Sequence, residues 1–154
     1  LLTLAAHATC MSKDPSTKVG SVIVRPDRTI VSTGYNGFPR GVADDPELYA
    51  DRASKYDRIV HAEANAIVTS REPLHGYTIY TWPLPICAEC AKLAIQAGIQ
   101  RFVSLRPTAF QLGRWARSLA VAEDMLTQAG RAVTQYAPER MAYAPSDAAV
   151  QARA

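Results

Sequence analysis

The sequence predicts an α/β fold in which a mixed β-sheet is covered on both faces by helices. Short apolar segments rich in β-branched residues alternate with segments of helical periodicity. Helices that separate consecutive strands require crossover connections, which favour a sheet containing parallel pairs. The chain has 154 residues, 48% of them hydrophobic and 20% charged, so it is large enough to bury a core without disulfides.

The first part of the chain predicts a helix followed by a β-hairpin. Residues 1–11 have helical periodicity, and residues 19–24 and 29–35 are apolar strands joined by a turn at Pro26 and Asp27. Strands joined by so short a turn pair in antiparallel fashion. Residues 36–58 contain several glycines and prolines, and we expect a long irregular connection of the kind that is often functional.

The following elements alternate between helix and strand. Gly98 and Gly130 stand where the C-terminal cap of a helix is expected. The predicted elements are a helix at 61–70, a strand at 77–82, a helix at 87–97, a strand at 99–105, a helix at 114–129 and a strand at 131–136. We therefore expect a single domain over residues 1–136, followed by a C-terminal tail over residues 137–154.

Charge and composition argue against several classes of protein. Seventeen Lys and Arg against fourteen Asp and Glu give a net charge of +3, and their scatter argues against nucleic acid as a partner. No apolar run reaches the roughly 18 residues of a membrane span, and the N-terminus lacks the basic flank of a secretory signal. Three cysteines do not suit a secreted disulfide framework, so we expect a reducing, cytoplasmic location.

Cys87 and Cys90 are the first candidate chemical group. At i and i+3 of a helix start, both sulfurs project to one side, and the helix dipole stabilises the thiolate. The spacing alone fits two buried cysteines, a redox pair or a zinc site. A structural zinc needs a fourth protein ligand. No second close pair exists among the remaining candidates, which are Cys10, His7, His61 and His75. A three-ligand site with a position open to water, as in catalytic zinc, fits better.

His61 is the best third ligand because Glu63 follows it at the same predicted helix start. A carboxylate at that position can reach a metal-bound water without binding the metal, and can then move its proton. Glu63 is also the kind of first-turn acid that a helix dipole favours. Both interpretations are compatible with the sequence.

Taken together, these motifs resemble those of zinc deaminases that act on nucleobases, which combine His-x-Glu with a downstream Cys-x-x-Cys. Here the two motifs are His61-Ala62-Glu63 and Cys87-Ala88-Glu89-Cys90. Two more segments, Gly34-Tyr35-Asn36-Gly37-Phe38-Pro39 and Lys55-Tyr56, are similar to the deoxycytidylate (dCMP) deaminase family. The similarity runs from about Ser12 to Tyr136. It implies a three-layer α/β/α cytidine-deaminase-like fold with a mixed five-stranded sheet.

The resemblance implies zinc-dependent hydrolysis of dCMP to dUMP and ammonia. Zinc held by His61, Cys87 and Cys90 acidifies a water. Glu63 takes the proton, passes it to N3 of the pyrimidine as hydroxide attacks C4, and then protonates the departing amino group. The family usually has a proline directly before the first zinc cysteine. This chain has Ile86 there, and we expect a shifted turn rather than a lost site.

Substrate contacts follow from the same resemblance and from charge. By resemblance, Asn36 holds the sugar and the Ala62 backbone faces the base. A phosphate needs cations or N–H groups, and we take Arg25 and Arg40 as candidate phosphate contacts. Trp82 is a candidate wall of the pocket, with an ordinary core position as the alternative.

Regulation and assembly are expected from the family resemblance. Gly37, Lys55 and Tyr56 match the family region near the effector phosphates, which predicts dCTP and dTTP as effectors. The family also implies a homo-oligomer, most simply a hexamer.

Two functions of other kinds remain open. A polynucleotide deaminase, resembling tRNA adenosine deaminases or cytidine editors, is disfavoured by the scattered charge and by the Gly34–Gly37 loop. A catalytically silent, zinc-stabilised binding module is disfavoured by Glu63, for which a purely structural site has no use.

Overall fold

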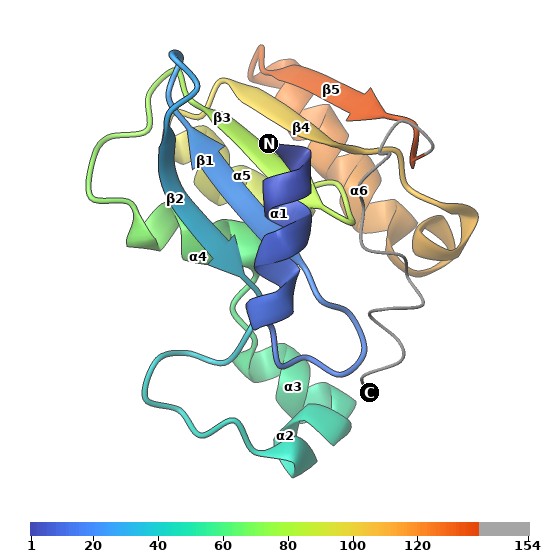
Figure 1. Ribbon diagram of the computed structural model, residues 1–154. Helices are drawn as coiled ribbons and strands as arrows, with labels where there is room; N and C mark the ends of the chain where they lie inside the picture. Colours follow the sequence, from blue (N-terminus) through green and yellow to red (C-terminus); the bar gives the residue numbers. More distant parts are fainter. Residues whose placement is uncertain (139–154) are drawn as a thin grey trace.

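A computed structural model describes residues 1–138 of the chain. Its centre is one five-stranded sheet with the order β2-β1-β3-β4-β5 (Figure 1). The strands are β1 (Gly20–Val24), β2 (Ile30–Tyr35), β3 (Thr78–Trp82), β4 (Arg101–Leu105) and β5 (Ala132–Tyr136). β1 pairs antiparallel with β2 and β3, whereas β3, β4 and β5 are parallel. The predicted hairpin and the predicted mixed sheet are both confirmed.

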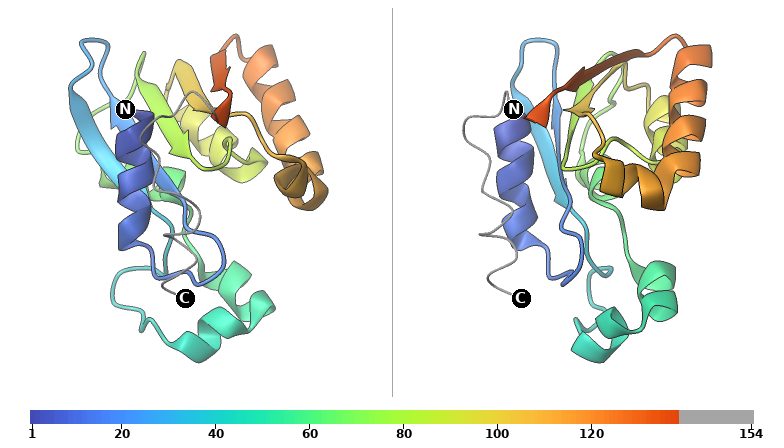
Figure 2. Two further views of the ribbon diagram at one scale, coloured as in Figure 1. Left: turned by 45° about the vertical axis from the view of Figure 1, so that its right-hand side comes forward. Right: turned by 90° about the vertical axis from the view of Figure 1, so that its right-hand side faces the viewer.

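Helices cover the sheet on its two faces. α1 (Leu2–Ala8), which continues into a short 3-10 turn at Thr9–Met11, lies on one face, and three helices lie on the other (Figure 2). Those three are α4 (Ala62–Thr69), α5 (Ala88–Gln96) and α6 (Ala109–Gln128). The expected three-layer α/β/α arrangement is therefore confirmed.

β1 is the centre of the core because both of its faces are buried. Val22 and Val24 pack with Ala5 of α1. Ile23 faces the other way and joins the larger cluster under α4, α5 and α6, which includes Ile79 and Phe102. Burial on two sides explains why this strand is a continuous apolar run rather than an alternating pattern.

The connection over residues 36–58 contains two short helices that the sequence prediction missed. They are α2 (Pro46–Ala50) and α3 (Arg52–Arg58). The side chains of Asp45 and Asp51 cap them by accepting hydrogen bonds from the second residue of each helix. Helices this short have too few turns to show a periodic apolar face, so their caps were the readable signal.

α6 begins at Ala109, five residues before the predicted start at Arg114. Its start is set by a capping box, in which the Thr108 hydroxyl accepts from the Gln111 N–H and the Gln111 side chain accepts from the Thr108 N–H. Among residues 1–138, no helix combines the length and hydropathy that a bilayer crossing requires. The tail predicted for residues 137–154 lies, from residue 139 onward, outside the described residues.

Candidate metal centre and active-site pocket

Hydrogen bonds from β2 and from the residues that follow it hold α4 and its approach in place. Gly37 and Val60 exchange two backbone hydrogen bonds, of 3.1 and 2.8 Å, just before His61. The Ser32 hydroxyl donates to the Ala66 carbonyl at 2.7 Å, so the helix lies directly on the strand. A Cβ at Gly34 would collide with the backbone of this helix, which explains the need for glycine there. His61 becomes the N-cap residue of α4, and Glu63 lies buried in its first turn.

The start of α5 presents the two cysteines. Cys87 is the N-cap residue of α5, and Cys90 lies in its first turn. The Ser118 hydroxyl of α6 accepts a hydrogen bond from the Ala88 N–H at 3.1 Å, so it satisfies one of the free N–H groups of this helix. Ile86 is buried in the core directly before Cys87. The missing proline has therefore not displaced the first cysteine from the helix start.

His61, Cys87 and Cys90 form a compact cluster of metal-binding atoms. Nδ1 of His61 lies 3.3 Å from Sγ of Cys87 and 3.4 Å from Sγ of Cys90, and the three atoms lie within 4.8 Å of one another. Tetrahedral zinc with ordinary Zn–S and Zn–N bonds separates its ligand atoms by about 3.5 Å. One imidazole and two thiols at this spacing therefore fit zinc with one position open.

The electrostatics of the cluster favour the metal-binding form of the first thiol. A hydrogen bond from Cys90, together with the His61 imidazole, lowers the pKa of Cys87 to about 4. The hydrogen bond with Cys87 in turn raises the pKa of His61 to about 9. Cys87 is thus held as a thiolate, the species that binds metals.

Glu63 is buried beside the cluster and is only 4% exposed. Burial is the main cause that raises the pKa of Glu63 to about 7, and the nearby negative charge of Cys87 adds to it. A carboxyl group with a pKa near neutrality can both accept and release a proton at neutral pH, which is what a general acid–base requires.

His61 and Cys87 of the cluster, together with Glu63, line a pocket of about 240 Å³. Its polar or charged lining residues are Asp14, Thr17, Asn36, Lys55, Tyr56, His61, Glu63, Cys87, Glu89 and Ser118. Its other lining residues are Val19, Ile59, Ala62, Leu84, Pro85, Trp115 and Leu119. The starts of α4 and α5 provide the metal-binding side, while α3, the Asp14–Val19 segment and α6 provide the walls.

Asn36 lines the pocket with every hydrogen-bonding position of its side chain in use. Its Oδ1 accepts from the Ser12 hydroxyl and the Val19 N–H, at 2.8 and 2.7 Å. Its Nδ2 donates to the Thr17 carbonyl at 2.8 Å and to Asp14 at 3.3 Å. Asn36 therefore ties the end of β2 to the segment that precedes β1.

A buried ion pair joins this wall to α3. Nζ of Lys55 lies 3.2 Å from Asp14, and both side chains are at least nine-tenths buried. Burial acts to raise the pKa of Asp14, but hydrogen bonds from Ser16 and Thr17 and the contact with Lys55 outweigh it, and the pKa lies below its ordinary value. The charge of Lys55 is thus neutralised inside the protein.

Arg25 and Arg40, the two expected phosphate contacts, do not line the pocket. Arg25 follows the last residue of β1, whereas the pocket lies at the first, beside Val19. There Arg25 pairs with Glu72 at 2.7 Å. Arg40 is exposed in the loop after β2. The direction of β1 explains the difference for Arg25, because a strand places its two ends on opposite edges of a domain.

Two of the three expected effector contacts line the pocket, and the third does not. Lys55 and Tyr56 line the same pocket as Glu63. Gly37 pairs with Val60 and is not a lining residue. The two side chains that the resemblance assigned to an effector therefore lie in the candidate active site.

α6 supplies a wall that sequence reasoning missed. Trp115, Ser118 and Leu119 stand at i, i+3 and i+4 and so share one helix face toward the pocket. Trp82, the expected wall, packs instead with Val22 and Val24 on the α1 side of the sheet. The spacing in α6 could have shown which residues share a face, but not what that face covers.

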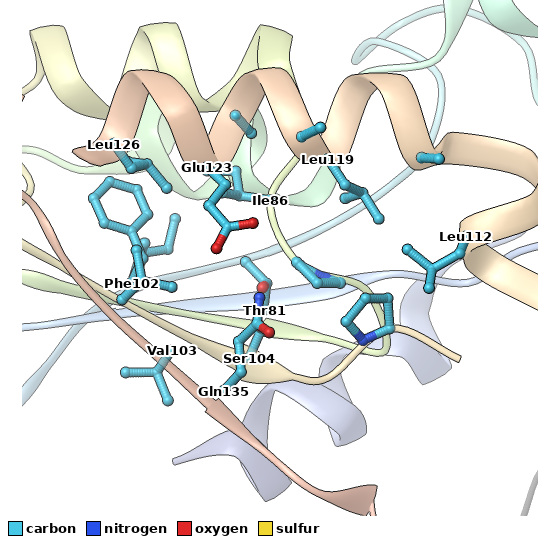
Figure 3. Close-up of a pocket in the computed structure, with 17 residues that line it drawn as sticks. Thr81, Ile86, Phe102, Val103, Ser104, Leu112, Leu119, Glu123, Leu126 and Gln135 are labelled. Carbon is cyan, nitrogen blue, oxygen red and sulfur yellow. The ribbon is translucent and has the colours of Figure 1, made fainter. Parts of the chain in front are cut away.

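A second cavity, of about 310 Å³, lies between α6 and strands β3 to β5 (Figure 3). Glu123, Thr81 and Ser104 line it among mainly apolar side chains. Pro85 and Leu119 line both cavities. α6 therefore borders two cavities. This one lies on the side of α6 that faces the sheet, and the metal-binding pocket lies at its N-terminal half.

The family model for the cytidine and deoxycytidylate deaminase zinc-binding region matches residues 1–106. The chain belongs to this family. The zinc cofactor expected from the motifs is a property of the family, and the His61–Cys87–Cys90 cluster is the zinc site that the structure offers. The matched region includes all three ligands and Glu63 but ends before α6.

Relatives of this deaminase chain extend the comparison. An uncharacterized deaminase in the luxG 3′ region of Aliivibrio fischeri is 43% identical over 123 residues, which are 80% of this chain and 82% of that protein. The deoxycytidylate deaminase of Mus musculus is 43% identical over 98 residues, or 60% of this chain. That of Homo sapiens is 42% identical over 98 residues. The matched part is 54% of each mammalian protein, so the chain spans about half their length.

Solved structures support the fold. The dCMP deaminase from the cyanophage S-TIM5 in apo form matches with a TM-score of 0.62 and 24% identity, over 88% of this chain and 93% of that one. The same enzyme in complex with dCMP and dUMP matches with a TM-score of 0.61 and 22% identity. This confirms the cytidine-deaminase-like architecture.

Proposed function

We propose that this chain hydrolyses dCMP to dUMP and ammonia. The observation that carries the proposal is the buried Glu63 beside a three-ligand metal cluster, inside a pocket of about 240 Å³. Relatives named deoxycytidylate deaminase, at 42–43% identity, support dCMP as the substrate. So does the cyanophage dCMP deaminase described in complex with dCMP and dUMP.

His61, Cys87 and Cys90 would hold the zinc, which when bound lowers the pKa of water and so supplies a nucleophile at neutral pH. Glu63 accepts the proton of the water that adds to C4 and delivers it to N3 of the pyrimidine. It then carries the second proton of that water to the exocyclic amino group, which leaves as ammonia. Water and dCMP are thereby converted to dUMP and ammonia with all atoms accounted for.

Two residues orient the substrate in this proposal. The buried Ala62, which follows the ligand His61 on the lining, faces the base with its backbone. Asn36 holds the sugar. Because all four of its hydrogen bonds are already used, a sugar hydroxyl competes with the longest of them, the 3.3 Å contact to Asp14.

A panel of substrates tests the proposal. Ammonia release should be measured with dCMP, CMP, cytidine, deoxycytidine, dCTP and a short single-stranded DNA, with the zinc content of the protein determined in parallel. We expect the highest kcat/KM with dCMP. Equal efficiency on the free nucleoside would move the chain to the cytidine deaminases, and preference for the oligonucleotide would make it a polynucleotide deaminase. A zinc-loaded protein that releases no ammonia from any of them would be a binding module.

We also propose a homohexamer in the cytoplasm, regulated by dCTP and dTTP. The family resemblance supports the assembly and the effectors, and the free thiols of Cys87 and Cys90 suit a reducing compartment. Because Lys55 and Tyr56 line the pocket, these effectors would bind at the substrate pocket itself rather than at a separate site.

A further inference from the structure

The two helices that carry the metal cluster begin without a side-chain cap of their own. His61 is the N-cap residue of α4 and Cys87 is that of α5, and neither side chain makes a capping hydrogen bond. By contrast, the N-cap side chains of α2, α3 and α6 each accept a hydrogen bond from their own helix; they are Asp45, Asp51 and Thr108. A side chain that faces the metal cluster is thus not available to the N–H groups that open its helix.

Other parts of the chain hold these two helix starts. α4 is fixed from the side of β2, by the Gly37–Val60 pair and by the Ser32 hydroxyl, which donates to the backbone of the helix. α5 packs against α6, and there the Ser118 hydroxyl accepts the N–H of Ala88 at 3.1 Å. Ala88 is the first residue of α5, so a hydroxyl from α6 acts where the helix has no cap of its own.

The hydrogen bond to Ser118 lies one residue from a metal ligand. Its donor, Ala88, directly follows Cys87, and Cys90 belongs to the same first turn. The bond therefore fixes the turn that presents both sulfurs to Nδ1 of His61, at 3.3 and 3.4 Å. An N–H left unpaired in this half-buried place costs free energy, which the turn relieves by moving toward another partner. Such a movement changes the spacing of the ligand atoms.

We propose that Ser118 is a positioning residue of the metal centre, which closes the start of α5 from α6 and so keeps Cys87 and Cys90 at the spacing that zinc requires. The inference rests on the proposed ligand set of His61, Cys87 and Cys90, and not on the identity of the substrate. Ser118 lies in α6, beyond the family match at residues 1–106. One support of the metal centre therefore comes from a helix outside the matched region.

Competition for zinc between the zinc-loaded protein and a chromogenic chelator tests the inference. Ser118→Ala should raise the Kd for zinc by about 10- to 100-fold, the usual effect of removing a group that orients metal ligands. Ser118→Thr keeps a hydroxyl and should stay close to the wild type. Ser118→Val has the shape of threonine without the hydroxyl, and it should bind zinc as weakly as Ser118→Ala.

The protein loaded with cobalt(II) in place of zinc gives a second readout, because the visible spectrum of cobalt responds to the geometry of its ligands. Ser118→Ala and Ser118→Val should change this spectrum, and Ser118→Thr should preserve it. Thr127→Ala is the matched control, since Thr127 is an exposed residue of the same helix whose hydroxyl donates to the Glu123 carbonyl. It should leave the zinc affinity and the spectrum unchanged.

Wild-type zinc affinity and cobalt spectrum in Ser118→Ala and Ser118→Val would overturn the inference, even if their thermal midpoints fall, because the hydroxyl would then serve stability alone. A wild-type protein that binds no zinc would overturn the ligand set and this inference together. A zinc-loaded wild type that releases no ammonia from any compound of the substrate panel would refute the proposed function, and the role of Ser118 would still be decided by the zinc affinities.

Discussion

Glu63 and Cys87 serve different parts of the same site, and substitution should separate them. Glu63→Gln keeps the shape of the buried side chain but cannot accept a proton, so we expect full zinc content and turnover at least ~10²-fold slower. Cys87→Ala removes a ligand of the three-atom cluster and should lose the zinc. Elemental analysis and ammonia release on the two variants measure this. Near-normal turnover of Glu63→Gln would place the proton transfer elsewhere, and full zinc retention by Cys87→Ala would refute the ligand set.

At the scale of elements, the buried Asp14–Lys55 pair joins the segment before β1 to α3. Asp14→Asn leaves Lys55 buried without its counterion, which should cost about 3 kcal/mol and lower the thermal midpoint by roughly 6–12 °C. The pKa of Asp14 is depressed in the folded protein, so the stabilisation is present above its unfolded pKa of about 3.9 and is lost as the pH falls through the folded pKa. Melting curves from pH 7 to pH 2 should therefore show the two proteins converging at the acid end. The exposed Lys13–Asp44 pair gives the control, because Lys13→Gln should barely move the midpoint. A constant gap at all pH values would contradict this account.

At the scale of the whole molecule, the family resemblance predicts a hexamer whose activity responds to dCTP and dTTP. Light scattering at micromolar concentration should give the mass of six chains of 16.7 kDa. Rate curves for dCMP should be sigmoidal, with dCTP and dTTP shifting them in opposite directions. A monomer with a hyperbolic curve that ignores both nucleotides would show an unregulated member of the family.

The sequence by itself determined the elements and the zinc chemistry, because both are encoded locally. Apolar runs and glycine caps located the five strands and the main helices. His61 and Glu63, and likewise Cys87 and Cys90, are close in the chain, so their spacing already places each pair on one helix start. The sequence prediction did not use the helix N-caps, which are the main local signals that it missed. They stand at Asp45, Asp51 and Thr108.

Only the tertiary structure decided what surrounds that chemistry. Asp14 and Lys55 are 41 residues apart, and Trp115 reaches the pocket from a helix beyond the family region. No spacing in the sequence records such contacts, since they arise when separate elements pack together. The same holds for Arg25, whose charge lies at the end of β1 away from the residues that line the pocket. Residue type shows what a side chain can bind, whereas strand direction and helix packing decide whether it is near enough to do so.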